Sequence, residues 1–245
     1  KRHWLSKKNE KNLALIINNS AEKQTISIGK KETDVDTQAV WSGRSGSVQC
    51  PKCGYTHKNI SIKDCQDALV ALVRPAGKTG KDFLLAPINA LPPNEVIEKF
   101  ESDALKELDA ELPSSVLPRW SGIVNPAIYG IETHAEFLNR RQRAMLLLLL
   151  KTLKEEFDVL KLEVGLYTAR YVIGVLSSLA DQLIDWNCRL SMWIPQNEQV
   201  GRAFCGPGVS MLWDYTETDP LLNGPANLWA KLERIIVGAS SIGKF

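Results

Sequence analysis

The sequence predicts an α/β chain of the α+β type, in which a β-rich half precedes a mainly helical half. Residues 1–90 hold short apolar runs separated by polar or glycine-containing turns, a pattern typical of β-hairpins. From residue 91 to 245 the apolar residues recur every three or four positions, as on buried helix faces. The 245 residues, 44% of them hydrophobic, are enough to build one large core or two small ones.

Two hairpins are expected in the first half. Residues 13–17 and 25–28 are apolar runs joined by a polar stretch, and they predict a pair of short strands. Residues 68–74 and 83–86 form a second pair around a loop at 75–81, where glycines and a proline favour a turn.

Four helices and one irregular segment are expected in the second half. The spacing of apolar residues and the capping signals predict helices over about 94–111, 140–158, 167–186 and 225–237, with Asn139 as the cap of the second. Residues 187–220 combine several aromatic residues with many prolines, glycines and polar residues. We therefore expect an ordered but non-repetitive segment held by aromatic anchors.

The formal net charge of +2 conceals an uneven distribution of charge. Residues 1–63 hold twelve Lys/Arg against five Asp/Glu, whereas residues 64–180 hold thirteen against sixteen and residues 181–245 hold five against seven. A basic excess at one end suits contact with phosphates, although a solvated lysine face produces the same pattern.

Composition also bears on the cellular compartment. The longest apolar run, residues 144–150, is far shorter than the roughly 20 residues of a membrane-spanning helix, so we expect no membrane association. Five cysteines, an odd number spread along the chain, argue against a secreted disulfide scaffold. A cytoplasmic protein with a metal site fits this cysteine usage.

The motif Cys-Pro-Lys-Cys-Gly at residues 50–54 predicts half of a zinc site. Cys50 and Cys53 have the spacing at which two thiolates bind one tetrahedral ion, and the glycine that follows lets the turn direct backbone amides at the sulfurs. His57 and Cys65 are one possible source of the missing ligands. The other is a second pair of cysteines upstream of Lys1, as in a zinc ribbon, and we favour this because strand-like residues begin directly at the chain start.

Five stretches carry a resemblance to a known family. They are HWLSKK (3–8), CPKCG (50–54), YGIETHAEFLNRRQRAMLLLL (129–149), LADQLIDWNCRLSMWIPQNEQVG (179–201) and VSMLWDYTETDP (209–220). With them the chain resembles the prokaryotic adenine-specific DNA methylases that contain a zinc ribbon, from about residue 3 to 238. Arg140 stands where that family has a proline, although Arg141 and Gln142 match.

The resemblance implies that this chain is the internal region of an S-adenosylmethionine-dependent DNA adenine N6-methyltransferase of a restriction or phage-defence type. In that family the glycine-rich cofactor motif precedes this region, the Asp-Pro-Pro-Tyr catalytic loop follows it, and the first cysteine pair lies just upstream. The segment alone is then expected to be inactive. It would engage DNA and work with the remaining methyltransferase region or with a separate catalytic subunit.

Two groups of candidate residues follow. The basic zinc-ribbon half and the arginines of the second helix are candidates for contact with DNA: Lys7, Lys8, Arg44, Arg140, Arg141 and Arg143. The aromatic-rich segment is a candidate for shaping a pocket or docking on the catalytic sheet: Trp193, Trp213, Asp214, Tyr215 and Glu217. The alternative function is a non-enzymatic subunit of a defence complex, which binds nucleic acid or supports assembly.

Overall fold

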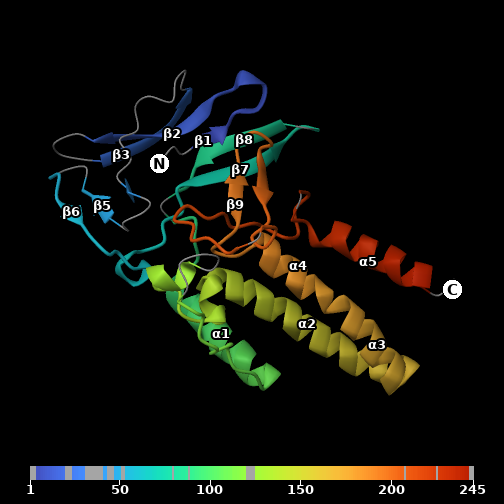
Figure 1. The fold of residues 1–245 in the computed structure, drawn as a ribbon. Coiled ribbons are helices and arrows are strands. Elements are labelled where there is room, and N and C mark those ends of the chain that lie inside the picture. Colours follow the sequence, from blue (N-terminus) through green and yellow to red (C-terminus); the bar gives the residue numbers. More distant parts are fainter. Residues whose placement is uncertain are drawn as a thin grey trace. The chain divides into compact units, whose positions relative to one another are not determined.

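The computed structural model describes residues 4–19, 24–30, 41–42, 47–50, 53–78, 80–87, 89–119, 125–206, 208–224 and 226–242. The chain divides into two compact units. Unit 1 comprises Lys1–Leu91, Pro118–Ile131 and Trp193–Gln199, and unit 2 comprises Pro92–Leu117, Glu132–Met192 and Val200–Phe245. Small sheets and helices are both present (Figure 1), so the predicted mixed α+β class is confirmed.

The first sheet of unit 1 contains the first predicted hairpin. Strands β1 (Trp4–Ser6), β2 (Leu13–Asn19) and β3 (Gln24–Lys30) form an antiparallel sheet in the order β1-β2-β3. Leu15 of β2 pairs with Ile28 of β3, which sets apolar side chains across from each other. The hairpin prediction is confirmed, and both strands extend beyond the apolar runs because the antiparallel ladder continues through the polar residues at their ends.

Two further small sheets complete the strands of unit 1. Strands β4 (Trp41–Ser42), β5 (Ser47–Gln49) and β6 (Thr56–His57) pair in sequence order around the cysteine motif. Strands β7 (Ala71–Ala76) and β8 (Gly80–Leu85) form the second predicted hairpin, with Val73 opposite Phe83. Unit 1 also has short 3-10 helices at Lys8–Glu10, Ile62–Asp64 and Pro126–Tyr129.

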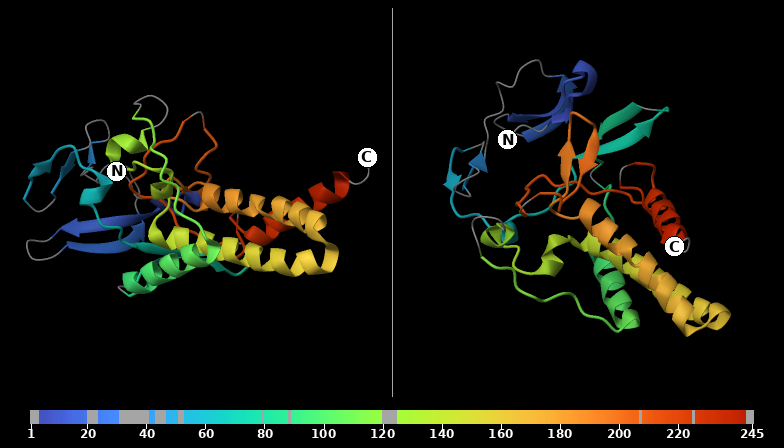
Figure 2. Two further views of the ribbon diagram at one scale, coloured as in Figure 1. Left: turned by 90° about the horizontal axis from the view of Figure 1, so that it is seen from below. Right: turned by 45° about the vertical axis from the view of Figure 1, so that its right-hand side comes forward.

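Unit 2 is built mainly from helices. They are α1 (Asn94–Leu108), α2 (Arg140–Val164), α3 (Leu166–Leu176), α4 (Ser178–Trp186) and α5 (Leu228–Ile242), with a 3-10 helix at His134–Phe137. Helices α1 and α3 both pack against α2 (Figure 1). Gly165, at φ +83°, lets α3 fold back along α2, and both views in Figure 2 show this reversal. No helix within the described ranges combines the length and the apolar content that crossing a membrane requires.

Each predicted helical segment contains helix, and one of the four contains two helices instead of one. A single helix was expected over 167–186, but the structure has α3 and α4 separated at Ser177. The hydroxyl of Ser177 donates to the carbonyl oxygen of Gly174 at 2.7 Å, and that of Ser178 donates to Val175 at 2.8 Å. Serine hydroxyls that bond the preceding turn bend helices, especially beside a glycine.

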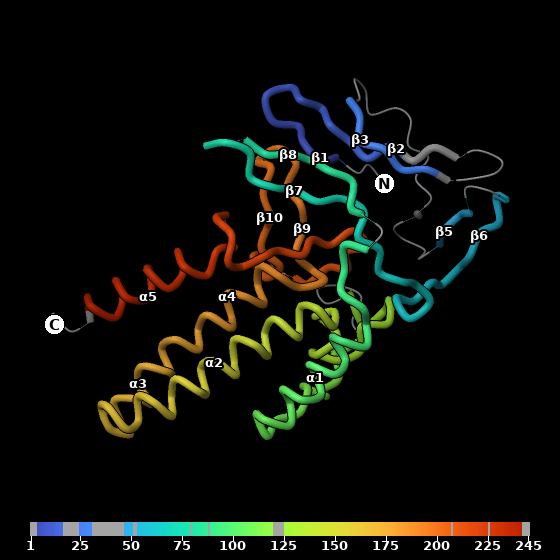
Figure 3. The backbone as a smooth tube through the Cα atoms, turned by 180° about the vertical axis from the view of Figure 1, so that it is seen from behind, coloured from blue at the N-terminus to red at the C-terminus, as the bar shows by residue number. Residues whose placement is uncertain are grey.

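The segment 187–220 is not wholly irregular, so that expectation was too broad. Strands β9 (Met192–Ile194) and β10 (Gln199–Gly201) pair with each other, and the tube of Figure 3 labels them side by side. The main-chain N–H of Asn197 donates to the carbonyl oxygen of Ile194 at 3.2 Å and closes the turn. Strands of three residues are too short to produce an alternating pattern in the sequence.

Candidate functional site

Two of the candidate arginines fasten the start of α2 to α1 within unit 2. Arg140 pairs with Glu98 and Arg143 pairs with Glu101, and these two glutamates lie one helical turn apart. Arg143 also donates to the carbonyl oxygen of Leu138 at 3.0 Å. Both guanidinium groups thus have a carboxylate partner in the described chain, and their contact with DNA stays a prediction.

The third arginine belongs to a polar cluster that contains two residues of the aromatic segment. Arg141 Nε donates to Glu217 Oε2 at 3.0 Å. The Asn139 amide donates to Glu217 Oε1 at 2.5 Å and to the hydroxyl of Tyr215 at 2.8 Å. Asn139 is 2% exposed, so its side chain is committed to these contacts. The cluster joins the start of α2 to a segment more than 70 residues later.

A second set of amides extends this cluster. Asn187, which is buried, accepts at Oδ1 from the main chain of Thr218 at 3.0 Å and from Gln142 Nε2 at 3.4 Å. Gln142 and Asn139 also form the capping box of α2, in which each side chain bonds the other's main chain. The cap and the polar cluster share Asn139 and are therefore one hydrogen-bonded network.

The other candidates for a pocket or docking surface are divided between the units. Trp213 is partly buried and Asp214 is exposed, both in unit 2. Trp193 belongs to unit 1, where its Nε1 donates to the carbonyl oxygen of Leu5 at 2.7 Å. Its ring meets Phe83 edge-on, with centroids 6.3 Å apart. Trp193 thus anchors the β9–β10 turn to β1.

The candidate lysines lie at the end of β1. Lys7 places its ammonium 4.5 Å from the ring centroid of Trp4, and its main chain donates to the carbonyl oxygen of Pro195 at 2.9 Å. Lys8 is exposed at the start of a 3-10 helix. Arg44 lies outside the described residues.

Cys50, Cys53 and Gly54, the described residues of the cysteine motif, follow β5 and are linked by main-chain hydrogen bonds. The N–H of Gly54 donates to the carbonyl oxygen of Cys50 at 2.9 Å, and the N–H of Cys50 donates to Tyr55 at 2.8 Å. Gly54 has φ +73°, which glycine adopts without strain. Cys53 is exposed and Cys50 partly so, which leaves the thiols accessible from this turn. Their spacing in the sequence is the one at which two thiolates can share a zinc ion.

The remaining ligands are not gathered at this turn. Across the described ranges, no group of three or more His, Cys, Asp or Glu side chains is arranged to hold a metal ion. His57 is on β6, with its ring edge-on to Tyr55 at 4.7 Å, and Cys65 is exposed after the capped 3-10 helix at Ile62–Asp64. The zinc-ribbon assignment therefore stays a prediction.

A buried carboxylate in unit 1 was not predicted. Glu198, in the β9–β10 turn, is 1% exposed. Its Oε1 accepts from Ser6 Oγ at 2.6 Å and from Lys11 Nζ at 3.1 Å, and its main-chain oxygen accepts from Lys81 Nζ. Glu198 has φ +51°, which is unfavourable for a residue with a side chain. Nothing in the polar stretch Pro-Gln-Asn-Glu distinguishes this glutamate from a solvated turn residue.

The charges around Glu198 affect one another. Burial alone would raise the pKa of the Glu198 carboxyl, but the hydrogen bonds from Ser6 and Lys11 and the charges of Lys11 and Lys8 outweigh burial, and the pKa is lowered. Burial lowers the pKa of the Lys81 ammonium; the charge of Glu198 opposes this, and those of Lys8 and Lys11 add to it. The charges of Lys8, Lys11 and Lys81 thus act on one another and on one glutamate, which Lys11 contacts at the carboxylate and Lys81 at the main-chain oxygen.

The two units differ in charge by as much as residues 1–90 and 91–245 of the sequence do. Unit 1 holds sixteen Lys/Arg against nine Asp/Glu, whereas unit 2 holds fourteen against nineteen. The basic excess of the chain therefore belongs to the β-rich unit.

Comparison with known proteins returns no relative: no family model, no curated protein and no solved structure matches this chain.

Proposed function

We propose that this chain is the DNA-engaging internal region of an S-adenosylmethionine-dependent DNA adenine N6-methyltransferase of a cytoplasmic restriction or phage-defence system. The observation that carries the DNA-binding part is the separation of charge, with sixteen Lys/Arg against nine Asp/Glu in unit 1. A compact basic unit suits a polyanion, because each lysine or arginine that neutralises a phosphate releases a condensed counterion. The methyltransferase part rests on the resemblance of the five sequence stretches.

This chain would share the work with a catalytic partner. The sequence has no glycine-rich turn after a strand and no Asp-Pro-Pro-Tyr loop. Methyl transfer to adenine N6, with the base flipped out of the duplex, is therefore assigned to the remaining methyltransferase region or to a separate catalytic subunit. This chain would hold the DNA backbone, which positions the duplex without reading its sequence.

A zinc ion is part of the proposal. Cys50 and Cys53 would hold it from the turn at the end of β5, and the other ligands would come from a second cysteine pair. The ion would be structural, because bound thiolates lock the turn and order the strands beside it.

The test is the salt dependence of DNA binding. We expect replacement of Lys7, Lys8 and Arg44 by alanine to weaken binding to duplex DNA. The plot of log K against log salt has a negative slope, and its magnitude should decrease by about 0.9 for each phosphate that the variant no longer neutralises. The matched control replaces Lys99, Lys106 and Arg170, three exposed cations of unit 2, by alanine. Unchanged affinity and slope in the first variant would refute the assignment.

A methylation assay separates this function from its alternative. The chain is recovered from its native host with its binding partners, and transfer of a labelled methyl group from S-adenosylmethionine to DNA is measured. The proposal expects transfer that depends on the partner, and incorporation at adenine N6. A complex that binds DNA but transfers no methyl group would instead identify a non-enzymatic binding or assembly subunit.

A further inference from the structure

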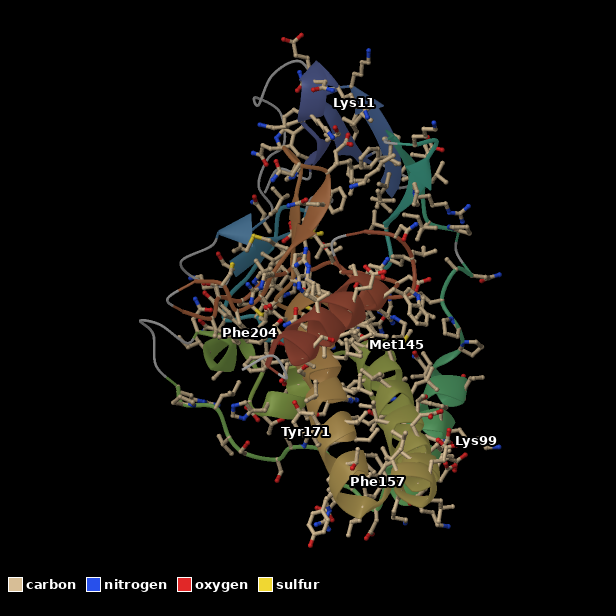
Figure 4. The ribbon with its side chains drawn as sticks, turned by 90° about the vertical axis from the view of Figure 1, so that its right-hand side faces the viewer. Lys11, Lys99, Met145, Phe157, Tyr171 and Phe204 are labelled. Atoms are coloured by element: carbon tan, nitrogen blue, oxygen red, sulfur yellow. The ribbon has the colours of Figure 1, made fainter. Side chains whose placement is uncertain are left out.

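Unit 1 contains an ionic cluster around a buried carboxylate that the proposed function does not use. It consists of Glu198 with Lys8, Lys11 and Lys81, brought together from the chain start, from β8 and from the β9–β10 turn. Lys11 is labelled in Figure 4. We call this group the lysine cluster.

Glu198 is costly to keep in its position. The carboxylate is almost fully buried, and an unpaired carboxylate is strongly disfavoured in such an environment. Its backbone has φ +51°, a conformation that residues other than glycine, asparagine and aspartate rarely adopt. The hydrogen bonds from Ser6 and Lys11 compensate the buried charge. A turn that only had to connect β9 and β10 would need neither the burial nor the charge.

The cluster carries more positive than negative charge. The charged groups that act on Lys81 are Glu198, Lys8 and Lys11, so three cations face one anion. Asp82, beside Lys81 on β8, projects to the opposite face because successive strand side chains alternate, and it is exposed. Glu10 is also exposed. The excess charge favours an anionic ligand at this place.

The lysines retain donors that such a ligand can use. An ammonium group has three N–H donors. Lys11 uses one on Glu198, and its side chain is 41% exposed, so the ammonium is within reach of solvent. Lys81 uses one on the main-chain oxygen of Glu198, with its ammonium also 5.7 Å from the ring centroid of Trp193. Lys8 is exposed.

We propose that Lys8 together with Lys11 and Lys81, which Glu198 holds in place, binds the phosphodiester backbone of DNA, an inference that rests on the proposed function and names its contact site. Glu198 is a positioning residue, which fixes two ammonium groups without touching the phosphate. Its carboxylate holds the side chain of Lys11, and its carbonyl oxygen holds that of Lys81.

The decisive variant is Glu198→Gln, because two explanations predict opposite signs. If Glu198 only adds negative charge near DNA, its removal raises the net charge by one and binding becomes tighter. If it positions the lysines, Lys11 loses its partner and binding becomes weaker. The magnitude of the negative slope of log K against log salt then decreases by about one. We expect the weaker binding. The matched control is Glu10→Gln, which makes the same charge change at an exposed residue.

A second set of variants keeps the test valid if Glu198→Gln fails to fold, as judged by its thermal unfolding. Lys11→Met leaves the bond between Ser6 and Glu198 in place, and we expect it to reduce the slope by about one. Lys11→Arg restores the charge and the donors and is expected to restore the slope. Lys58→Ala, at an exposed lysine of unit 1, controls for the loss of one charge.

The outcomes distinguish failure of this inference from failure of the proposed function. Wild-type protein with no salt-dependent DNA binding would overturn both. The lysine cluster alone would be overturned by a different result. In it the wild type binds DNA normally, Glu198→Gln binds as tightly or more tightly, and Lys11→Met binds no more weakly than Lys58→Ala. Inorganic phosphate serves as the competitor. The lysine cluster is supported if phosphate displaces DNA from the wild type but does not displace the DNA that Lys11→Met still binds.

Discussion

At the scale of single residues, the partners of a charged side chain decide its role, and those partners lie far away in the sequence. Arg141 was expected to contact DNA and Glu217 to line a pocket, yet within unit 2 they meet each other and Asn139. Glu198 would pass for a solvated turn residue, yet it is the most deeply buried carboxylate among the described residues of unit 1. Residue type and spacing contain no information about such pairings.

The polar cluster of Asn139, Arg141, Tyr215 and Glu217, called the Glu217 cluster below, gives a prediction about stability. Glu217→Gln removes the charged partner of Arg141 while keeping the shape, and these two side chains are only 27% and 19% exposed. Losing one hydrogen-bonded partner of a partly buried charge is expected to cost about 1–3 kcal/mol of unfolding free energy. The measurement is urea unfolding of wild type and variant.

The control for this variant is Glu98→Gln on α1. Glu98 and its partner Arg140 are each 51% exposed, and solvent screens such a pair to a value of about 0–1 kcal/mol. An equal loss of stability in both variants would show that the Glu217 cluster has no special structural weight.

At the scale of elements, local signals predicted where helices begin better than where they bend. Asn139 was expected before the second helix, and it caps α2 through a complete capping box with Gln142. Asn227 performs the same task for α5, accepting from Trp229 N at 2.7 Å. The bend at Ser177 was missed because a serine within an apolar helical pattern is compatible with either a straight or a bent helix.

The cysteine turn after β5 gives a prediction about metal binding. Two thiolates occupy two of the four positions of a tetrahedral zinc ion, so we expect this chain alone to bind zinc weakly and to lose it to a chelator. Cys50→Ser should abolish even this binding, whereas Cys205→Ser, at an exposed cysteine of unit 2, should leave it unchanged. Stoichiometric zinc that resists chelation would instead indicate completion by His57 and Cys65. Atomic absorption of purified protein measures both.

At the scale of the whole molecule, the compact units are assembled from segments that are separated in the sequence. Unit 1 includes residues 118–131 and 193–199 in addition to the first 91 residues. The later segments supply hydrogen-bond partners: Trp193 for Leu5, Glu198 for Ser6, and the Tyr129 carbonyl oxygen for the Ser61 hydroxyl. A division into residues 1–90 and 91–245, as drawn from the sequence, separates these partners.

This arrangement predicts the behaviour of a fragment. Residues 1–91 alone should fail to form unit 1. The buried hydroxyl of Ser6 would lose Glu198, and the carbonyl oxygen of Leu5 would lose the indole N–H of Trp193. The measurement is amide dispersion in a proton–nitrogen NMR spectrum, with the full chain as reference. A fragment with dispersed resonances and a cooperative thermal transition would contradict the prediction.

The amino-acid sequence by itself determined the features that depend on near neighbours. The mixed class, the two hairpins, the four helical stretches and the cap at Asn139 all follow from period, turn residues and capping, which act over a few positions. Only the tertiary structure decided which charged groups meet: Arg141 with Glu217, and Lys11 with Glu198. Those pairs join residues 76 and 187 positions apart, and the packing of distant segments, rather than any local preference, selects them.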